Sequence, residues 1–224
     1  MENGTQINWN THVDMYCERL DAAFWAEPVN ALTNIFFLLA AFFAFRLWKN
    51  SASRSWDLLT LSILMAVVGI GSFVFHTVAT KWAGLADVLP IAIFIHFGLG
   101  VFLYRVANSG LMISMLGVFA FALASVGMQK LIPASFSNYS SQYFPAVILL
   151  LGMWLFTLLK KAPSAKYFLY ALVIFAISLT LRTLDAAICD AFPIGIHFMW
   201  HVLNSIVMYN VFKGVIANSR ISVE

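Results

Sequence analysis

Three histidines have the residue type and spacing that suit a metal centre. His197 and His201 are four residues apart in a hydrophobic run, so on a helix their imidazoles would share one face. His76, in another hydrophobic run, is the natural third ligand. Three neutral imidazoles with one open position form a catalytic zinc site, which brings the pKa of a bound water to about 7. Taken alone, such a pair in a membrane helix more often makes helix–helix hydrogen bonds.

Two further polar residues lie near His76 in the sequence. Ser72 precedes it by one helical turn, and its hydroxyl is suited to stabilise the oxyanion of an attacked carbonyl. Asp87 follows a short turn and is suited to orient a histidine ligand or to accept a proton from water. The simpler interpretations are helix packing for Ser72 and a helix cap for Asp87. His96 is interpreted as structural, and His12 is uninformative.

The composition places these residues in a membrane. The chain has 224 residues, of which 62% are hydrophobic and 10% charged, with a mean hydropathy of +0.86. Soluble domains average about 45–50% apolar and about 25% charged residues. A 25.0 kDa globule has too large a surface to hide this much apolar side chain. A soluble enzyme, a nucleic-acid-binding protein and a disordered chain are therefore excluded.

Seven hydrophobic runs predict an all-α integral membrane fold with seven transmembrane helices. Each run is close to the roughly 20 residues that a spanning helix needs, and none alternates as a barrel strand does. The runs are Pro28–Trp48, Leu58–Val78, Asp87–Arg105, Leu111–Met128, Tyr143–Leu159, Tyr167–Leu184 and Ile194–Phe212. We expect an extracytoplasmic N-terminal segment, a seven-helix domain and a short cytoplasmic tail at residues 1–27, 28–216 and 217–224.

The Lys and Arg residues indicate the orientation, because cytoplasmic loops carry an excess of them. With the N-terminus outside, the cytoplasmic segments hold Arg46, Lys49, Arg54, Arg105, Lys160, Lys161, Lys166, Lys213 and Arg220. The outer segments then hold only Arg19, Lys81, Lys130 and Arg182. We therefore predict the N-terminus outside and the C-terminus inside. This places the three histidines and Asp87 at one depth near the outer surface, which weighs against a proton or ion path across the bilayer.

Acidic residues in the N-terminal segment raise the prospect of a second metal site. Calcium takes six to eight oxygen ligands, and the candidates here are Asp14, Glu18, Asp21 and Glu27. The alternative is a solvated acidic segment, with Glu27 complementing the start of the first helix. The sequence alone leaves both interpretations open.

The chain has two cysteines, which the predicted topology places on the same side. Cys17 lies in the N-terminal segment and Cys189 in the loop before the seventh run. Both would face the oxidising side of the membrane, where disulfides persist. We therefore predict a Cys17–Cys189 disulfide beside the histidine cluster. The alternative is a pair of buried free thiols.

These motifs together resemble the alkaline ceramidase family, part of the CREST superfamily that also includes the progestin and adiponectin receptors. The resemblance is carried by Ser72-x3-His76, Asp87 and His197-x3-His201. It extends to Tyr16-Cys17-Glu18, Glu27-Pro28-x-Asn30 and Thr33-Asn34 at the start, and so covers nearly the whole chain. The short termini are similar to those of bacterial members.

The resemblance implies a zinc-dependent intramembrane hydrolase that cleaves ceramide to a sphingoid base and a fatty acid. It implies zinc bound by His76, His197 and His201, with Asp87 transferring the proton and Ser72 stabilising the oxyanion. It also implies paired cysteines and a calcium site. The eukaryotic calcium motif Asp-Trp-Cys-Glu-x-Asn is altered here, because the Trp is absent and Leu20 stands at the Asn position. Asp21 is the candidate substitute.

The expected partner is therefore a lipid drawn from the bilayer, either ceramide or another lipid amide, with no nucleic acid and no obligatory protein partner. The expected location is the bacterial inner membrane. One alternative function is a receptor of the adiponectin-receptor type, in which zinc is structural and turnover is absent. The other is a transporter that uses His76 and Asp87 as a relay.

Overall fold

The computed structural model describes residues 7–52, 54–132, 137 and 139–218, and in these residues the chain is helical without strands. The long hydrophobic runs form helices because their backbone hydrogen bonds must be satisfied within the segment in a lipid environment. The helices are α1 (Pro28–Thr33), α2 (Ile35–Lys49), α3 (Trp56–Val78), α4 (Lys81–Arg105), α5 (Gly110–Leu131), α6 (Phe144–Leu159), α7 (Ala165–Leu184) and α8 (Phe198–Asn218). Two short 3-10 helices are η2 (Ser140–Tyr143) and η3 (Asp185–Ala187).

Six helical segments in the described part of the chain are long and apolar enough to cross a membrane. They are Pro28–Lys49, Trp56–Val78, Lys81–Arg105, Gly110–Leu131, Ser140–Leu159 and Ala165–Ala187. The expectation of an all-helical, multi-pass membrane protein is confirmed. The seventh run forms α8, whose polar side chains, among them His201, Asn204 and Asn210, lower its hydropathy. The seventh span therefore stays a prediction.

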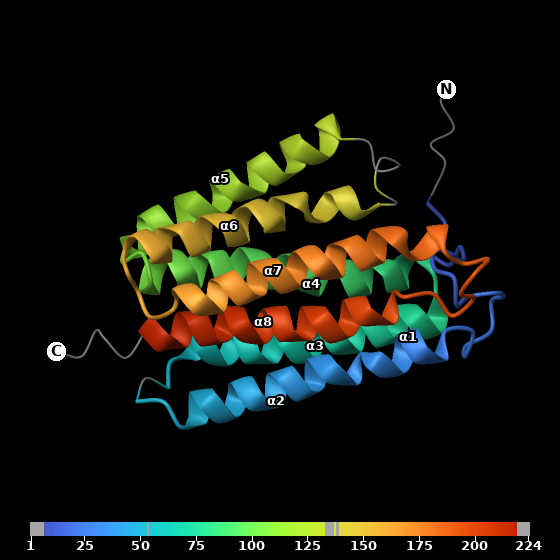
Figure 1. Ribbon diagram of the computed structural model, residues 1–224, viewed down its shortest axis with the longest axis horizontal. Helices are drawn as coiled ribbons and strands as arrows, with labels where there is room; N and C mark the ends of the chain where they lie inside the picture. The colour runs from blue at the N-terminus through green and yellow to red at the C-terminus, as the bar shows by residue number, and fades with distance from the viewer. Residues whose placement is uncertain (1–6, 53, 133–136, 138, 219–224) are drawn as a thin grey trace.

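The polar helix α8 lies inside the bundle. It packs against α2, α3, α4 and α7, whereas α5 lies at the edge of the bundle beside α4 and α6 (Figure 1). More than half of the α8 residues are buried, including His201, Asn204 and Asn210. Neighbouring helices therefore shield the polar residues of α8 from the surrounding lipid, and they supply hydrogen-bond partners there.

Two of the predicted helix starts are wrong. The third run was expected to begin at Asp87, but α4 begins at Lys81, because the Asp87 carboxylate is accommodated against α3 rather than at a helix end. The seventh was expected to begin at Ile194, but α8 begins at Phe198 and runs to Asn218. The helix therefore passes the boundary expected at residue 216. The predicted tail beyond 218 and the first six residues lie outside the described residues.

The helices alternate in direction, so that the bundle has two distinct ends (Figure 1). One end carries the N-terminal segment, the end of α3, and the starts of α4 and α8. The other end carries most of the described Lys and Arg residues, among them Arg46, Lys49 and Arg105. This separation is the charge asymmetry on which the predicted orientation depends.

Helices α3 and α4 approach closely because a glycine lies between them. A Cβ added at Gly71 would lie 2.1 Å from the backbone oxygen of Ala86. The contact sets Ser72, the next residue on α3, against Asp87, the next residue on α4. The glycine thus positions two of the predicted site residues. By contrast, a Cβ added at Gly127 on α5 would meet no atom within 4 Å.

We expect Gly71→Ala to destabilise the protein by about 1–3 kcal/mol, the usual cost of overpacking a tight contact. The control Gly127→Ala should be neutral, or stabilising by up to about 1 kcal/mol, because alanine favours a helix interior. Thermal unfolding of the purified proteins in one detergent measures both. An unchanged midpoint for Gly71→Ala would show that the two helices do not depend on this contact.

Candidate metal centre

Three buried histidines converge at the end of the bundle that carries the N-terminal segment. His76 lies near the end of α3, His201 lies in the first turn of α8, and His197 lies in the turn just before α8. Each is at most 2% exposed. One ring nitrogen from each residue lies within 4.8 Å of the other two. In the described part of the chain no other group of three or more His, Cys, Asp or Glu residues forms such a cluster.

Hydrogen bonds at Nδ1 assign the tautomers of two of these histidines, His76 and His201. His76 Nδ1 lies 2.6 Å from Glu27 Oε2, a carboxylate oxygen that can only accept, so Nδ1 carries the proton. His201 Nδ1 lies 2.9 Å from Thr33 Oγ1. The single Thr33 hydroxyl proton points to the backbone oxygens of Val29 and Asn30, so the hydroxyl oxygen accepts from His201. Both Nε2 atoms therefore carry lone pairs.

These two lone pairs face each other. The Nε2 atoms of His76 and His201 lie 3.1 Å apart in a buried site. Two unprotonated nitrogens at this distance repel each other unless a cation lies between them. Zinc–nitrogen bonds of about 2.0–2.1 Å in a tetrahedral site hold two ligand nitrogens about 3.3 Å apart. His197 adds a buried Nδ1 that has no hydrogen-bond partner among the described residues. The donor set therefore fits a divalent metal ion.

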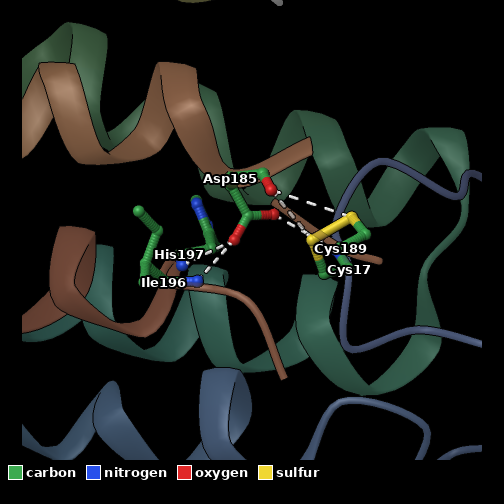
Figure 2. The surroundings of a disulfide bond; sticks show 5 residues. All are labelled: Cys17, Asp185, Cys189, Ile196 and His197. Carbon is green, nitrogen blue, oxygen red and sulfur yellow. Dashed lines mark hydrogen bonds between the residues drawn. A yellow bond between two sulfur atoms is a disulfide. The ribbon is translucent and has the colours of Figure 1, made fainter. Parts of the chain in front are cut away.

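His197 does not lie on the helix, contrary to the sequence-based expectation, although it still reaches the cluster. Its ring stacks on Tyr16, with ring centroids 3.5 Å apart. Its backbone N–H donates to Asp185 Oδ1 at 2.9 Å, and the backbone N–H of Ile196 donates to the same oxygen at 2.7 Å (Figure 2). Gly195 has a φ of +68° and leaves no room for a side chain, because an added Cβ would lie 2.3 Å from Asp185 Oδ1. The Asp185 carboxylate thus holds the loop before α8 through two backbone hydrogen bonds.

The same carboxylate connects the loop to the predicted disulfide, which the structure confirms. Cys17 and Cys189 are bonded, and the backbone N–H of Cys17 donates to Asp185 Oδ2 at 3.1 Å (Figure 2). The fully buried Asp185 therefore joins the N-terminal segment to the start of α8. Sequence reasoning missed Asp185 because its role depends on the fold of the loop that surrounds it.

Ser72 and Asp87 lie together beside this cluster. Ser72 is buried on α3, one turn before His76, and its hydroxyl hydrogen-bonds the Asp87 carboxyl group. The other Asp87 oxygen, Oδ1, is buried and has no partner among the described residues. Asp87 is also close enough to His76 for an electrostatic interaction. The arrangement leaves one carboxylate oxygen available to a ligand.

The four acidic candidates for calcium are placed differently from one another. Glu18 accepts backbone N–H groups of Val29 and Asn30 at 2.7 and 2.8 Å, and so caps the start of α1. Burial raises the pKa of Glu18, although these hydrogen bonds oppose the shift. Asp21 accepts a backbone N–H from within its own turn, and Asp14 is exposed. These acids form no metal-binding cluster among the described residues, so calcium stays a prediction.

Arg19 connects the acidic segment to the backbone at His76. Its guanidinium pairs with Glu27 and donates to the backbone oxygen of His76 at 3.0 Å and to that of Asp21 at 3.0 Å. Burial alone would raise the pKa of Glu27, but hydrogen bonds from His76 and Arg19 outweigh it and hold that pKa below its ordinary value. Glu27 therefore stays ionised and can hold the His76 tautomer. The sequence leaves calcium binding and a place at the start of the first helix open for Glu27, and in the structure its carboxylate contacts Arg19, Asn30 and His76.

An apolar cavity lies within the bundle, and its wall includes Trp200 and Asn204, which flank His201 on α8. Phe37, which also lines the cavity, lies 6.5 Å from the His201 ring between ring centroids. The remaining lining residues are mostly aliphatic and aromatic side chains of α3, α4, α6, α7 and α8. Such an apolar lining suits a hydrocarbon group.

The fold and the site define a multi-pass helical membrane protein with a buried three-histidine centre and an apolar cavity in the same bundle. The family model for ceramidases matches residues 13–221, nearly the whole chain, and the protein belongs to the ceramidase family. The family is one of hydrolases acting on amide bonds, and membership supports a ceramide-hydrolysing function. A search of curated proteins found no match.

We expect the purified protein to carry about one divalent metal ion per chain, and His76→Ala to reduce this to a small fraction. The control is His96→Ala, because His96 lies on α4 with its Nδ1 on a backbone oxygen of the same helix and outside the cluster. Elemental analysis after dialysis measures the content. Equal metal content in wild type and His76→Ala would contradict the assignment of this cluster.

Glu27→Gln should weaken metal binding by roughly 10- to 100-fold, as removal of a carboxylate behind a ligating histidine typically does. The substitution removes the negative charge that faces His76 and Arg19. Competition with a chromophoric chelator measures the affinity, with the exposed Asp14→Asn as control. If the metal affinities of Glu27→Gln and Asp14→Asn both equal that of wild type, Glu27 does not strengthen metal binding by His76.

Proposed function

We propose that the protein is a zinc-dependent intramembrane amidase that hydrolyses ceramide, or a similar lipid amide, to a sphingoid base and a free fatty acid. The observation that carries the proposal is the pair of facing Nε2 lone pairs on His76 and His201, completed by His197. Zinc suits three imidazole ligands, and membership of the ceramidase family favours an amide substrate.

A zinc ion held by these residues would act as a Lewis acid and make a water nucleophilic near neutral pH. The chain's own residues would supply the rest. The apolar cavity binds a hydrocarbon chain of the lipid and excludes bulk water from it. Hydrolysis adds water across the amide C–N bond. In the proposed mechanism Asp87 accepts the proton that the water loses and delivers it to the leaving amine nitrogen.

Ser72 has the complementary role in this mechanism. Its hydroxyl donates to the Asp87 carboxylate one turn from His76, and once Asp87 has accepted a proton from water the same O–H can turn to the carbonyl oxygen as negative charge develops there. The Gly71 contact holds Ser72 against α4, so only the hydroxyl proton has to turn from Asp87 to the carbonyl oxygen.

The proposed topology has seven spans, with α8 as the seventh, the N-terminus outside and the C-terminus in the cytoplasm. The separation of Lys and Arg toward one end of the bundle supports this orientation, and burial of α8 by its neighbours allows a polar helix to cross the bilayer. In a bacterial inner membrane the histidine cluster would then lie near the periplasmic face. A lipid from the bilayer is the proposed partner, with no obligatory protein.

Purified wild type should release fatty acid from a fluorescent ceramide. We expect Ser72→Ala to lower kcat by roughly 10²–10³-fold, the usual cost of losing an oxyanion donor. Asp87→Asn should lower it by roughly 10²–10⁴-fold. Both variants should retain their metal, and His96→Ala should retain activity. Bound zinc without turnover in wild type would instead support the receptor alternative, and turnover unaffected by Asp87→Asn would remove Asp87 from the mechanism.

A further inference from the structure

The apolar cavity contains one amide side chain. Asn204, on α8, lines it and is buried, with 8% of its surface exposed. Apart from the Tyr143 hydroxyl and the Trp200 indole N–H, the other lining side chains are hydrocarbon or thioether, together with Gly98. A primary amide in such a wall is costly unless its donors and acceptor find partners.

Asn204 has only part of its hydrogen-bonding capacity satisfied by the protein. Its Nδ2 lies 3.2 Å from Ser178 Oγ on α7, and within the described residues Oδ1 has no partner. The Ser178 hydroxyl can equally donate to the amide oxygen if the amide is turned over, which would leave the NH2 group unpartnered instead. In either orientation one polar atom of the amide is available to the cavity.

The position of Asn204 relates it to the histidines. It follows His201 by three residues on α8, so the two side chains lie on neighbouring faces and about 4.5 Å apart along the helix axis. A lipid amide whose carbonyl lies at the histidine cluster would therefore pass Asn204 within the first few bonds from the scissile C–N bond. A hydroxyl group there can both donate and accept, and so fits either orientation of the amide.

We propose that Asn204 is a specificity-determining residue that selects lipid amides bearing a hydroxyl group within about four bonds of the scissile amide. Ser178 holds the side-chain amide of Asn204 in place. The proposal rests on the proposed amidase function and names the substrate class of that site. The hydroxyl can lie on either side of the amide, at C2 or C3 of the acyl chain or near the nitrogen on the amine-derived chain. In both cases the chemistry read by Asn204 is the same.

The test compares four matched substrates: an N-acyl alkylamine without hydroxyls, its 2- and 3-hydroxyacyl counterparts, and the unsubstituted acyl chain on an amine that carries hydroxyls at the sphingoid positions. Wild type should favour one hydroxylated series by roughly 3- to 10-fold in kcat/KM, the typical value of one net hydrogen bond. Asn204→Leu, close in volume, should lose that preference while still hydrolysing the unsubstituted amide. The series whose advantage disappears identifies the side of the amide that Asn204 reads.

Asn210→Leu is the matched control. Asn210 is also a buried amide on α8, but it donates to the backbone oxygen of Ile206 and does not line the cavity. It should keep the wild-type preference. Equal kcat/KM of wild type on all four substrates would overturn the proposal without any variant, so the proposal stays testable if Asn204→Leu does not fold. Equal loss of preference in both variants would also overturn it.

A binding measurement separates this proposal from the amidase function. Thermal stabilisation of wild type by 2- or 3-hydroxy fatty acids, or by hydroxylated long-chain amines, should exceed that by the unsubstituted compounds, and Asn204→Leu should remove the difference. Absence of turnover with this binding preference intact would reject the amidase and leave the role of Asn204 standing. Turnover without any preference in rate or binding would support the amidase function and reject the role of Asn204.

Discussion

The metal centre depends on where two imidazole protons lie: on Nδ1 of His76 and on Nδ1 of His201. His76 donates its Nδ1–H to Glu27 and His201 donates its Nδ1–H to Thr33, so both Nε2 atoms carry lone pairs, and these atoms lie 3.1 Å apart. In a dry interior this pair is unfavourable without a cation, because the local dielectric constant is low and water cannot intervene. The protein therefore presents a site that a metal ion stabilises.

The N-terminal segment and the loop before α8 are organised around that pair. Arg19 holds the Glu27 carboxylate and the backbone at His76, and Glu18 caps the helix from which Asn30 and Thr33 extend. The Cys17–Cys189 disulfide and Asp185 connect the segment to the loop that delivers His197. Segments far apart in the sequence thus converge on three imidazoles. A cross-link between them restricts the unfolded chain and keeps the ligands together.

Much of the site could be predicted from the sequence, and the reasons are physical. Polar residues are expensive at membrane depth, so His76, Asp87 and His201 stand out against a hydrophobic background. Antiparallel helices then place the end of one run beside the start of another. The disulfide followed from two cysteines on one predicted side. The start of α4 was misplaced because a carboxylate was taken to mark a helix end, whereas Asp87 lies inside the helix against Ser72.

The residues behind the ligands could not be predicted in the same way. Charge alone made Glu27 a calcium candidate, since spacing does not show that its carboxylate meets His76 rather than a free cation. Thr33 and Asp185 act through hydrogen bonds that exist only once α1 and the loop before α8 are folded. His197 was assigned to a helix because its spacing from His201 is helical, but closure of the loop onto Asp185 leaves it one residue before α8.

X-ray absorption at the zinc edge of the purified protein tests the central claim most directly. The account predicts a zinc ion with three imidazole nitrogens at about 2.0–2.1 Å and one further light-atom ligand. The imidazole signature should disappear in His76→Ala. A protein that binds no zinc, or one whose zinc has no imidazole ligands, would contradict the account.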